Sequence, residues 1–374
     1  MEIHELQQLL SEMSLQEKIG QMVQLTGVYF DKEAVLTGVV GEQLPPEWII
    51  QYAGSVLGVI GKDKIYDIQS RYMEQHPHHI PLLFMADVIH GCRTIFPIPL
   101  GQACSFHPEL VSEAASIAAS EASSEGLRAT FSPMIDVSRD PRWGRMMESF
   151  GEDGYQQKAD TGIAACLKHF AGYGAVNAGR EYNDVEISQR TFLEQYVKPF
   201  RMALKAKPAM VMTAFNAIDR KPISGNKELL KGLLRDKEGF EGTVISDWGS
   251  IGQLEEQGVA ADMEEAAIQA SEAGVDIDMM SPAYMLCLEK LVESGKIPEA
   301  FVDESAFRVL MMKNQLGLFE NPFAGLGKSG KLTLHNREKA YQLAGESCVL
   351  LKNEKKILPL SIKKKVIWAG PYTA

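Results

Sequence analysis

The sequence predicts an α/β fold, an irregular (β/α)8 TIM-like barrel, on three observations. Apolar runs suited to buried strands alternate with amphipathic stretches whose apolar positions recur every three and four residues. Three of these runs, far apart in the chain, end in polar residues: Asp87, the pair Lys168 and His169, and Asp247 followed by Trp248. The 374 residues, 45% of them hydrophobic, suffice for one barrel of about 250 residues and further elements.

Seven strands are predicted, at 55–60, 81–87, 129–137, 163–169, 209–214, 243–247 and 275–279. Because an ideal barrel has eight strands, we expect an irregular barrel or a further first strand near residues 22–28. Amphipathic patterns predict helices at 108–125, 188–205, 227–234, 263–273 and 303–318. A crossover between parallel strands needs about a dozen residues, whereas only 156–161 precede the strand at 163. We therefore expect a barrel helix to be missing near residues 155–162.

The domain organisation follows from composition along the chain. The barrel is expected to be the catalytic domain and to span residues 1–320, and turn-forming residues mark a linker at 321–335. A helical pattern at 335–351 and a strand-like run at 365–369 predict the start of a second domain, residues 336–374. That strand has nothing to pair with in its own segment, so the second domain is expected to be truncated.

Composition excludes several classes of partner. The net charge of −11 and the pI of about 5.3 argue against nucleic acid, and the only basic cluster is the short run 363–365. No apolar run approaches the length of a membrane span, and acids near the amino terminus argue against a signal peptide. Five cysteines without paired spacing predict neither disulfides nor a zinc site. We expect a cytoplasmic protein with buried thiols.

The polar residues at strand ends allow two interpretations each. Asp247 suits a nucleophilic carboxylate beside the flat indole of Trp248, but an acid there is equally typical of a helix N-cap. Lys168 and His169 could hold an acidic or hydroxyl-rich ligand, or Lys168 could form a structural ion pair. Successive strand residues point to opposite faces, so we expect only one of these two in the pocket.

Other polar groups favour structural roles. Arginines in 136–145 could grip hydroxyls or carboxylates, although Arg–Asp pairs within this loop are expected for Arg139 and Arg142. Asp276 and Asp278 could line the pocket, but the favoured interpretation is that they order a neighbouring loop. The histidines of 76–79 precede a strand, where a polar loop is favoured over a metal site.

Ordered motifs over nearly the whole chain resemble glycoside hydrolase family 3, in its β-glucosidase branch. The matching stretches are 85–91 (MADVIHG), 131–136 (FSPMID), 139–145 (RDPRWGR), 148–153 (ESFGED), 168–174 (KHFAGYG), 211–216 (VMTAFN), 245–248 (ISDW), 346–353 (ESCVLLKN) and 358–360 (LPL). The resemblance implies the amino-terminal barrel of such an enzyme, followed by the first elements of an α/β sandwich domain.

By this resemblance Asp247 is the nucleophile of a retaining mechanism and forms a covalent glycosyl-enzyme. The residues that match sugar-binding positions are Asp87, Arg93, Arg145, Lys168, His169, Met212, Phe215 and Trp248. Met212 and Trp248 match apolar walls of the subsite. At Phe215 many relatives have tyrosine, so one hydroxyl near the nucleophile is absent.

The activity implied is that of a retaining exo-β-glucosidase acting on terminal non-reducing β-D-glucosyl residues of short oligosaccharides or glucosides. A retaining enzyme needs a second carboxyl about 5–5.5 Å from the nucleophile. In the β-glucosidase branch it comes from the later domain, and the loop 175–184 lacks the Asp-Ser-His triplet of the hexosaminidase branch. We therefore expect the acid/base from a carboxy-terminal domain or partner chain, with Glu181 and Asp184 as weak substitutes.

Two alternatives remain beside this function. One is a catalytically incomplete, sugar-binding half of a split or truncated enzyme; the other is a β-xylosidase specificity within the same family. Neither a cofactor nor a metal is implied, because two carboxylates suffice for the reaction. A homodimer is compatible with the sequence.

Overall fold

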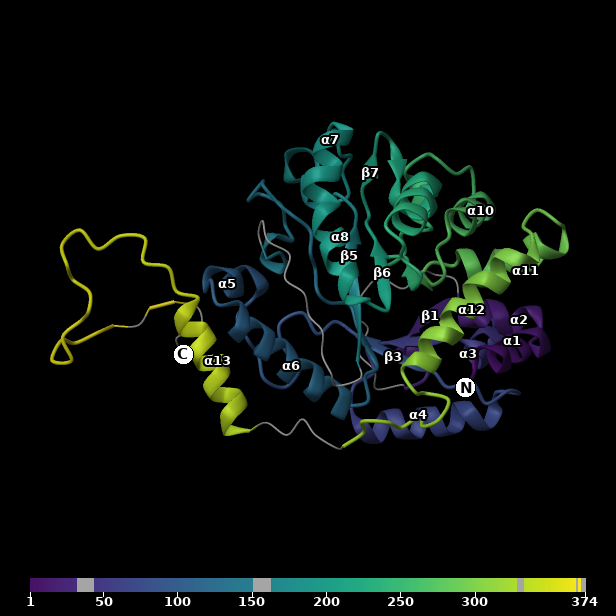
Figure 1. Ribbon diagram of the computed structural model, residues 1–374, viewed down its shortest axis with the longest axis horizontal. Coiled ribbons are helices and arrows are strands. Elements are labelled where there is room, and N and C mark those ends of the chain that lie inside the picture. The colour runs from purple at the N-terminus through teal and green to yellow at the C-terminus, as the bar shows by residue number, and fades with distance from the viewer. Residues whose placement is uncertain (32–43, 151–162, 328–332, 368, 371–374) are drawn as a thin grey trace.

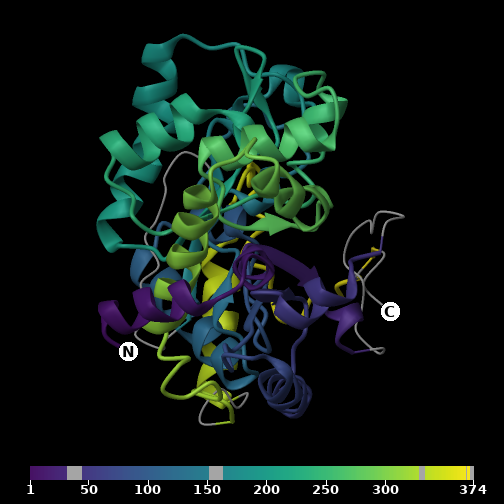
Figure 2. The same cartoon turned by 90° about the vertical axis from the view of Figure 1, so that its right-hand side faces the viewer.

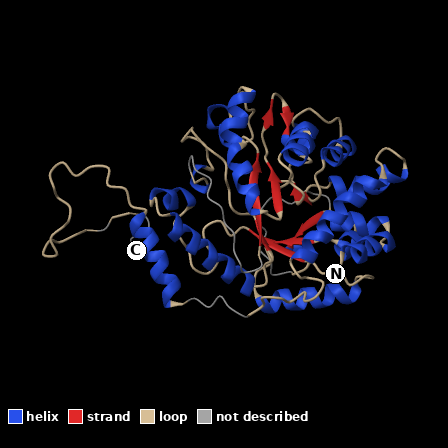
Figure 3. Cartoon of the chain, viewed as in Figure 1, coloured by secondary structure: helices blue, strands red, loops and turns tan. Residues whose placement is uncertain are grey.

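The computed structural model describes residues 1–31, 44–150, 163–327, 333–367 and 369–370 of the chain. Eight parallel strands form a barrel in its interior (Figure 3). They are β1 (Val23–Thr26), β2 (Ser55–Leu57), β3 (Leu83–Ala86), β4 (Ala129–Thr130), β5 (Ala164–Phe170), β6 (Met210–Thr213), β9 (Thr243–Ile245) and β10 (Asp278–Met279). Their spatial order is β10-β1-β2-β3-β4-β5-β6-β9, and a parallel bridge between Ile245 and Ile277 closes the ring.

The predicted irregular (β/α)8 barrel is confirmed. The additional first strand expected near residues 22–28 is β1. The predicted strand 129–137 is wrong in length, since β4 ends at Thr130. Beyond it Met134 forms an isolated bridge to Lys168, and single backbone hydrogen bonds still join residues 131–135 to β3 and β5. Pro133 lies between Thr130 and Met134 and has no N–H to donate to a ladder, which accounts for the interruption.

The helices that surround or follow the barrel are α1 (Ile3–Glu12), α2 (Leu15–Gln21), α3 (Glu47–Tyr52), α4 (Lys62–Gln75), α5 (Pro99–Cys104), α6 (Pro108–Ser124), α7 (Gln189–Thr191), α8 (Lys198–Ala203), α9 (Gln253–Glu256), α10 (Met263–Ala273), α11 (Ala283–Glu293), α12 (Glu299–Gln315) and α13 (Leu334–Glu346). The predicted helix 188–205 is divided into α7, a π-helical turn (Phe192–Tyr196) and α8. Pro199, in the first turn of α8, cannot donate a backbone hydrogen bond to the preceding turn. The helix predicted at 227–234 is a π-helix, Glu228–Lys237.

Figures 1 and 2 show that the first and last helices of the barrel lie side by side, since α1 and α2 pack on α12 and α2 also packs on α11. Inside the ring, strand side chains form an apolar core that includes Val309, Met312 and Leu318 from α12 and the turn after it. The hydroxyl of Thr243, the first residue of β9, donates to the carbonyl of Arg308 at 3.4 Å. The helix α12 therefore closes the amino-terminal end of the barrel, and the carboxyl ends of the strands face the opposite side.

Beyond the barrel, α13 packs against α6 and leads into an extended stretch that leaves the body of the molecule (Figure 1). Leu343 is the buried contact of α13, and it packs with Leu110, Val111 and Phe150. The strand predicted at 365–369 is not formed in its described residues, 365–367 and 369, because no neighbouring strand pairs with them. The division of the chain at 320 and 336 remains a prediction. The expected loss of a helix at 155–162 lies outside the described residues.

The cysteines only partly follow the prediction of buried thiols. Cys166 and Cys287 are buried, Cys92 and Cys104 are partly buried, and Cys348 is exposed just beyond α13. None of the helices within the described ranges is long and apolar enough to cross a membrane.

Candidate active site

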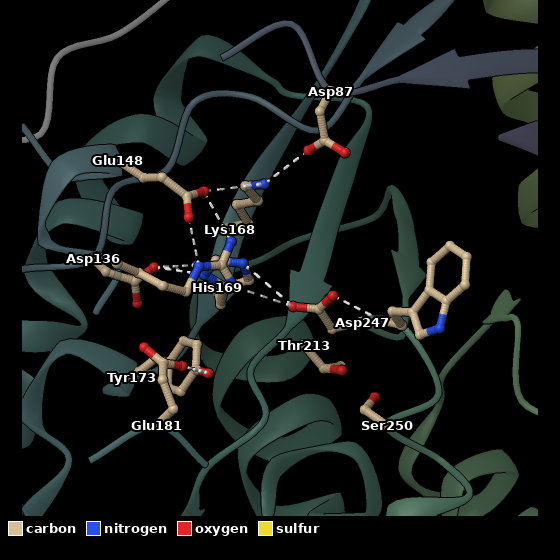
Figure 4. A network of polar contacts seen from close by, with 12 residues as sticks. Asp87, Asp136, Glu148, Lys168, His169, Tyr173, Glu181, Thr213, Asp247 and Ser250 are labelled. Atoms are coloured by element: carbon tan, nitrogen blue, oxygen red, sulfur yellow. Dashed lines mark hydrogen bonds and ion pairs between the residues drawn. The ribbon is translucent and has the colours of Figure 1, made fainter. Parts of the chain in front are cut away.

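Asp247 lies at the carboxyl end of β9, held by the ends of the neighbouring strands (Figure 4). The hydroxyl of Ser246 accepts the backbone N–H of Met279 at 2.8 Å, which fixes the residue before Asp247. The N–H of Trp248 donates to Asp247 Oδ1 at 2.7 Å. The following helix, α9, has Gly252 at its N-cap, so the interpretation of Asp247 as a helix cap is wrong.

The second carboxylate oxygen of Asp247 is the unusual atom of the site. Oδ2 lies 3.3 Å from His169 Nε2 and 3.9 Å from an Arg145 nitrogen. It is buried, and among the described residues no donor meets hydrogen-bond geometry with it. Burying a carboxylate oxygen without a partner is costly. The oxygen is therefore positioned for something other than the stability of the barrel.

His169 is itself held from behind by Asp136. Asp136 Oδ2 accepts the backbone N–H of His169 at 2.7 Å and lies 2.8 Å from its ring Nδ1. Both side chains are buried, and the ring of Tyr173 packs edge-on against the imidazole at 5.4 Å between centroids. Asp136 was not predicted as a site residue. Its place beside the end of the strand predicted at 129–137 was the signal that could have identified it.

Both Lys168 and His169 enter the pocket, so the prediction that only one of them does is wrong. Lys168 Nζ lies 3.0 Å from Asp87 Oδ1 and 3.8 Å from Glu148 Oε2, whereas His169 faces Asp247 (Figure 4). The register of β5 against β6 shifts between Leu167 and Phe170. This irregularity breaks the alternation of a regular strand.

Arg145 joins the two halves of this cluster. It donates to both oxygens of Glu148, at 2.7 and 2.9 Å, and its guanidinium also lies 3.9 Å from Asp247. Glu148 was not predicted as a site residue, although it lies in a quoted motif. We refer below to Asp87, Asp136, Arg145, Glu148, Lys168, His169 and Asp247 as the rim cluster.

Burial shifts the pKa of three members of the rim cluster, Asp136, His169 and Asp247. It raises the pKa of Asp247 to about 6, against the opposing charges of Arg145 and Lys168. It raises the pKa of Asp136 to about 7, against the hydrogen bond from the His169 backbone. Burial also lowers the pKa of His169 well below its usual value. Near neutral pH the site therefore combines an ionised Asp247 with a neutral imidazole.

Aromatic side chains form the wall beside the cluster. Phe215 is buried and packs against the rings of Tyr173 and Tyr182, at 5.8 and 4.9 Å between centroids. Met212 is buried in the core inside the barrel, and the partly exposed Trp248 packs on that core. Met212 and Trp248, the two residues predicted as walls, thus lie on β6 and just after β9, and their contact with a sugar remains a prediction.

The structure does not bring Arg93 to the rim cluster. Its guanidinium forms an ion pair with Glu125, which follows α6, and its backbone N–H donates to Glu121 at 2.9 Å. The two acids near the end of α6 account for this position, and contact of Arg93 with a sugar remains a prediction. Glu181 accepts a hydrogen bond from the Tyr173 hydroxyl, and Asp184 is exposed.

The remaining candidates have structural contacts. Asp278 accepts hydrogen bonds from the Ser281 hydroxyl at 2.7 Å and the Tyr284 N–H at 3.1 Å, which orders the start of α11. His76 is buried between the rings of Tyr52 and Tyr72. Within the described ranges, no group of three or more His, Cys, Asp or Glu side chains is placed to hold a metal ion.

The fold and the rim cluster define a class of protein, the (β/α)8 barrels that carry charged groups at the carboxyl ends of their strands, where enzymes of this fold have their active sites. Its family follows from comparison with known proteins. A model described as the glycosyl hydrolase family 3 N terminal domain matches residues 14–312, and the chain belongs to this family.

Relatives of known name agree with this assignment. A protein of Salmonella typhimurium named periplasmic beta-glucosidase is 38% identical over 97% of this chain and 49% of its own length. A putative beta-xylosidase of Formosa agariphila is 36% identical over 97% of this chain and 53% of its own. A beta-glucosidase of Listeria innocua, solved in complex with isofagomine, superimposes with a TM-score of 0.91 at 43% identity, over 96% of this chain and 53% of that one.

The chain spans about half the length of the curated relatives that it matches. The Salmonella protein is named periplasmic, so the cytoplasmic location of this chain remains a prediction.

Proposed function

We propose that the chain is the nucleophile-bearing barrel of a retaining exo-acting β-glucosidase that removes terminal non-reducing β-D-glucosyl residues from short oligosaccharides or glucosides. The observation that carries the proposal is Asp247 Oδ2, a buried oxygen without a hydrogen bond from the described residues at the open end of the barrel. The name of the Salmonella relative, and the Listeria innocua beta-glucosidase solved with glucose and, as a mutant, with laminaribiose, support a β-glucoside as substrate.

In this mechanism the ionised Asp247 attacks the anomeric carbon of the terminal sugar. The new carbon–oxygen bond forms as the bond to the leaving oxygen breaks, and water later releases the sugar with retention of configuration. Since the pKa of Asp247 is about 6, raised by burial, the carboxylate is mostly ionised at neutral pH. The partly exposed indole of Trp248 supplies an apolar surface for the sugar ring.

The cations of the rim cluster suit the hydroxyls of that sugar. Lys168 is buried and reaches Asp87, whose side chain is 54% exposed. A sugar at this position would receive hydrogen bonds from the Lys168 ammonium and donate hydroxyl hydrogens to the Asp87 carboxylate. The ion pair of Lys168 with the exposed Asp87 would thus give way to hydrogen bonds from both side chains to the sugar.

We propose that the acid/base comes from outside this chain, from a carboxy-terminal domain or a partner chain. Glu148 is held by Arg145, and Glu181 is held by the Tyr173 hydroxyl and directed away from Asp247 (Figure 4). Loss of an acid commonly reduces a rate by a factor of about 10²–10⁴. The chain alone should therefore act only on glucosides whose leaving group needs little protonation.

The test is hydrolysis of 2,4-dinitrophenyl and methyl β-glucosides by this chain, with the first-formed anomer followed by NMR. We expect β-glucose from the dinitrophenyl substrate, slow reaction of the methyl glucoside, and recovery when the carboxy-terminal half of a relative is added. α-Glucose as the first product would contradict the retaining mechanism. Glucose binding without turnover of either substrate would favour the incomplete sugar-binding half.

A β-xylosidase specificity is the second candidate, and the Formosa agariphila relative named putative beta-xylosidase favours it. The two sugars differ by the C6 hydroxymethyl group, which the rim cluster does not by itself require. Comparison of kcat/KM for 4-nitrophenyl β-glucoside and β-xyloside decides between them. We expect the glucoside to be preferred, and a preference for the xyloside would replace the proposed substrate.

A further inference from the structure

Three buried groups of the rim cluster lie in line, and the proposed mechanism uses only the last. Asp136 Oδ2 lies 2.8 Å from His169 Nδ1, and His169 Nε2 lies 3.3 Å from Asp247 Oδ2 (Figure 4). The side chain of Asp136 is 1% exposed and that of His169 is fully buried. Asp136 therefore has no direct access to a sugar in the pocket.

The 2.8 Å contact is a hydrogen bond and needs one proton. The 3.3 Å contact lies outside hydrogen-bond geometry, but at this distance an N–H facing the carboxylate oxygen is favoured over a lone pair, so it takes the second proton. Two protons on the two carboxylates and the imidazole give a net charge of −1, whichever atoms carry them. With both protons on His169, the ring is an imidazolium between two carboxylates. With one proton on His169, the other lies on either Asp136 or Asp247. These three arrangements differ only in where the protons lie along the line.

The surroundings select among the three. Burial lowers the pKa of His169 well below its usual value, which disfavours the imidazolium. Asp247 lies 3.9 Å from the Arg145 guanidinium and its side chain is 11% exposed, whereas the side chain of Asp136 is 1% exposed and lies against His169, so the ionised form is favoured at Asp247 and the proton at Asp136. The pKa values agree with this order, since burial raises that of Asp136 to about 7 and that of Asp247 to about 6. The other charged or titratable groups around the line are Asp87, Arg145, Glu148, Cys166, Lys168, Tyr173 and Tyr182.

We propose that Asp136 is a positioning residue, which donates its proton to Nδ1 of His169 and so keeps the ring in the tautomer whose Nε2–H points at Asp247. This role rests on the proposed function of Asp247. The backbone N–H of His169, donated to the same oxygen of Asp136 at 2.7 Å, fixes the carboxyl group against the ring. Through the ring, Asp136 stabilises the ionised nucleophile without touching substrate.

The variant Asp136→Asn tests this assignment because it preserves shape and changes the proton. The amide oxygen must accept the His169 backbone N–H, so the same oxygen accepts from Nδ1 and forces the proton onto that nitrogen. A lone pair of Nε2 then faces Asp247, which keeps its proton to higher pH. A hydrogen bond to an ionised group corresponds to about one to two pH units.

Two measurements read the change. Nitrogen-15 NMR of the imidazoles, with His169→Gln to assign the signal, should show Nε2–H in the parent protein above pH 7 and Nδ1–H in Asp136→Asn. The second measurement is the pH dependence of labelling by 2-deoxy-2-fluoro-β-glucosyl fluoride, whose fluoride leaves with its electron pair without an acid. In Asp136→Asn the pH below which the labelling rate falls, the acid limb of the profile, should rise by about one to two units. Because the pKa of Asp247 starts at about 6, the labelling rate near pH 7 should fall about 2- to 10-fold as a consequence.

The matched control is Asp278→Asn. Asp278 is another fully buried acid with a pKa raised by burial to about 7, but its contacts are Ser281 and Tyr284. It should lose stability without changing the His169 tautomer or the acid limb. A merely structural role for Asp136 would give the same pattern in both variants.

The proposal is overturned if the parent protein carries Nδ1–H, or if Asp136→Asn changes neither the tautomer nor the acid limb. Should Asp136→Asn not fold, the parent spectrum alone decides. Absence of labelling in the parent protein would count against the proposed function of Asp247, whereas the spectrum would still report the tautomer. The two failures are therefore distinguishable.

Discussion

Two buried aspartates flank the neighbouring strands β9 and β10 at opposite ends of the barrel: Asp247 follows β9 and Asp276 precedes β10. They differ in how many hydrogen bonds their carboxylate oxygens accept. At the amino-terminal side, Asp276 Oδ2 accepts from Arg235 at 2.6 Å and from the Val244 N–H at 2.8 Å, and Oδ1 accepts from Arg308 at 2.9 Å. At the carboxyl side, Asp247 Oδ1 accepts a hydrogen bond from the Trp248 N–H, whereas Oδ2 receives no hydrogen bond from the described residues.

Burial alone therefore does not identify a functional carboxylate. Asp276 is less exposed than Asp247, yet two guanidinium groups and a backbone donor use both of its oxygens. A saturated carboxylate has no remaining oxygen to attack a carbon atom, whereas Asp247 Oδ2 has. Asp276 has a structural role, but it joins Arg235, Arg308 and the N–H of Val244 rather than ordering a neighbouring loop as expected. The contrast agrees with barrels whose functional groups lie at the carboxyl end and whose amino end serves stability.

The largest effect is expected from Asp247→Asn. Removing a nucleophile commonly costs a factor of about 10⁴ or more in rate, so turnover of dinitrophenyl β-glucoside should fall by at least about that factor. The amide removes a buried charge, so the melting temperature should not fall much. Steady-state rates and calorimetry measure both, and an unchanged rate would refute the nucleophile.

Asp276→Ala should show the opposite pattern. It leaves Arg235 and Arg308 without their shared carboxylate, and breaking a buried ion pair in this way costs about 3–5 kcal/mol. Urea unfolding measures the loss, and labelling of Asp247 per folded molecule should persist. As a control, Arg190→Ala in the exposed pair with Glu194 should change stability little. Equal stability of Asp276→Ala and the parent protein would show that Asp276 does not stabilise the barrel, contrary to the contrast drawn with Asp247.

Lys168→Met should affect ligand binding more than folding. The methionine retains much of the length of the side chain but loses the charge-assisted hydrogen bonds expected with sugar hydroxyls, which contribute about 1.5–3 kcal/mol. We expect kcat/KM for activated glucosides to fall roughly 10- to 100-fold. Met210→Leu, in the same core at the first residue of β6, is a volume-conserving control outside the predicted subsite. A kcat/KM equal to that of the parent protein would exclude Lys168 from the subsite.

Asp278→Asn should change how stability depends on pH. Burial raises the pKa of Asp278 to about 7, above the value of about 3.9 in an unfolded chain. Between these values the unfolded state binds fewer protons than the folded state, so stability falls as pH rises, by up to about 1.4 kcal/mol per unit. The variant should flatten this slope between pH 5 and 7 in urea titrations. If the slope of stability against pH did not change in Asp278→Asn, a group other than Asp278 would be responsible for it.

The barrel could be predicted from the sequence because strand runs and helical periodicity are local signals. The same reasoning identified Asp87, Lys168, His169 and Asp247, since each follows an apolar run at the carboxyl end of a strand. Strand β1, expected only as an alternative to an irregular barrel, is short and leads directly into a 3-10 turn, so its pattern was weak.

Contacts between distant segments could not be predicted in this way. Arg93 is drawn to Glu125 by an ion pair across 32 residues of sequence, and no periodicity encodes that choice. Asp136 supports His169 from behind, so its role depends on the fold of β5 rather than on its own motif. The strand predicted at 365–369 failed because strand formation requires a partner that local pattern does not supply.

The most direct test of the central claim, that Asp247 is the nucleophile, is mass spectrometry of the parent chain after incubation with 2-deoxy-2-fluoro-β-glucosyl fluoride. We expect one added 2-fluoroglucosyl group, located on the proteolytic peptide that contains Asp247 and absent in Asp247→Asn. An adduct on another carboxylate, such as Glu148, or no adduct on the folded chain, would contradict it.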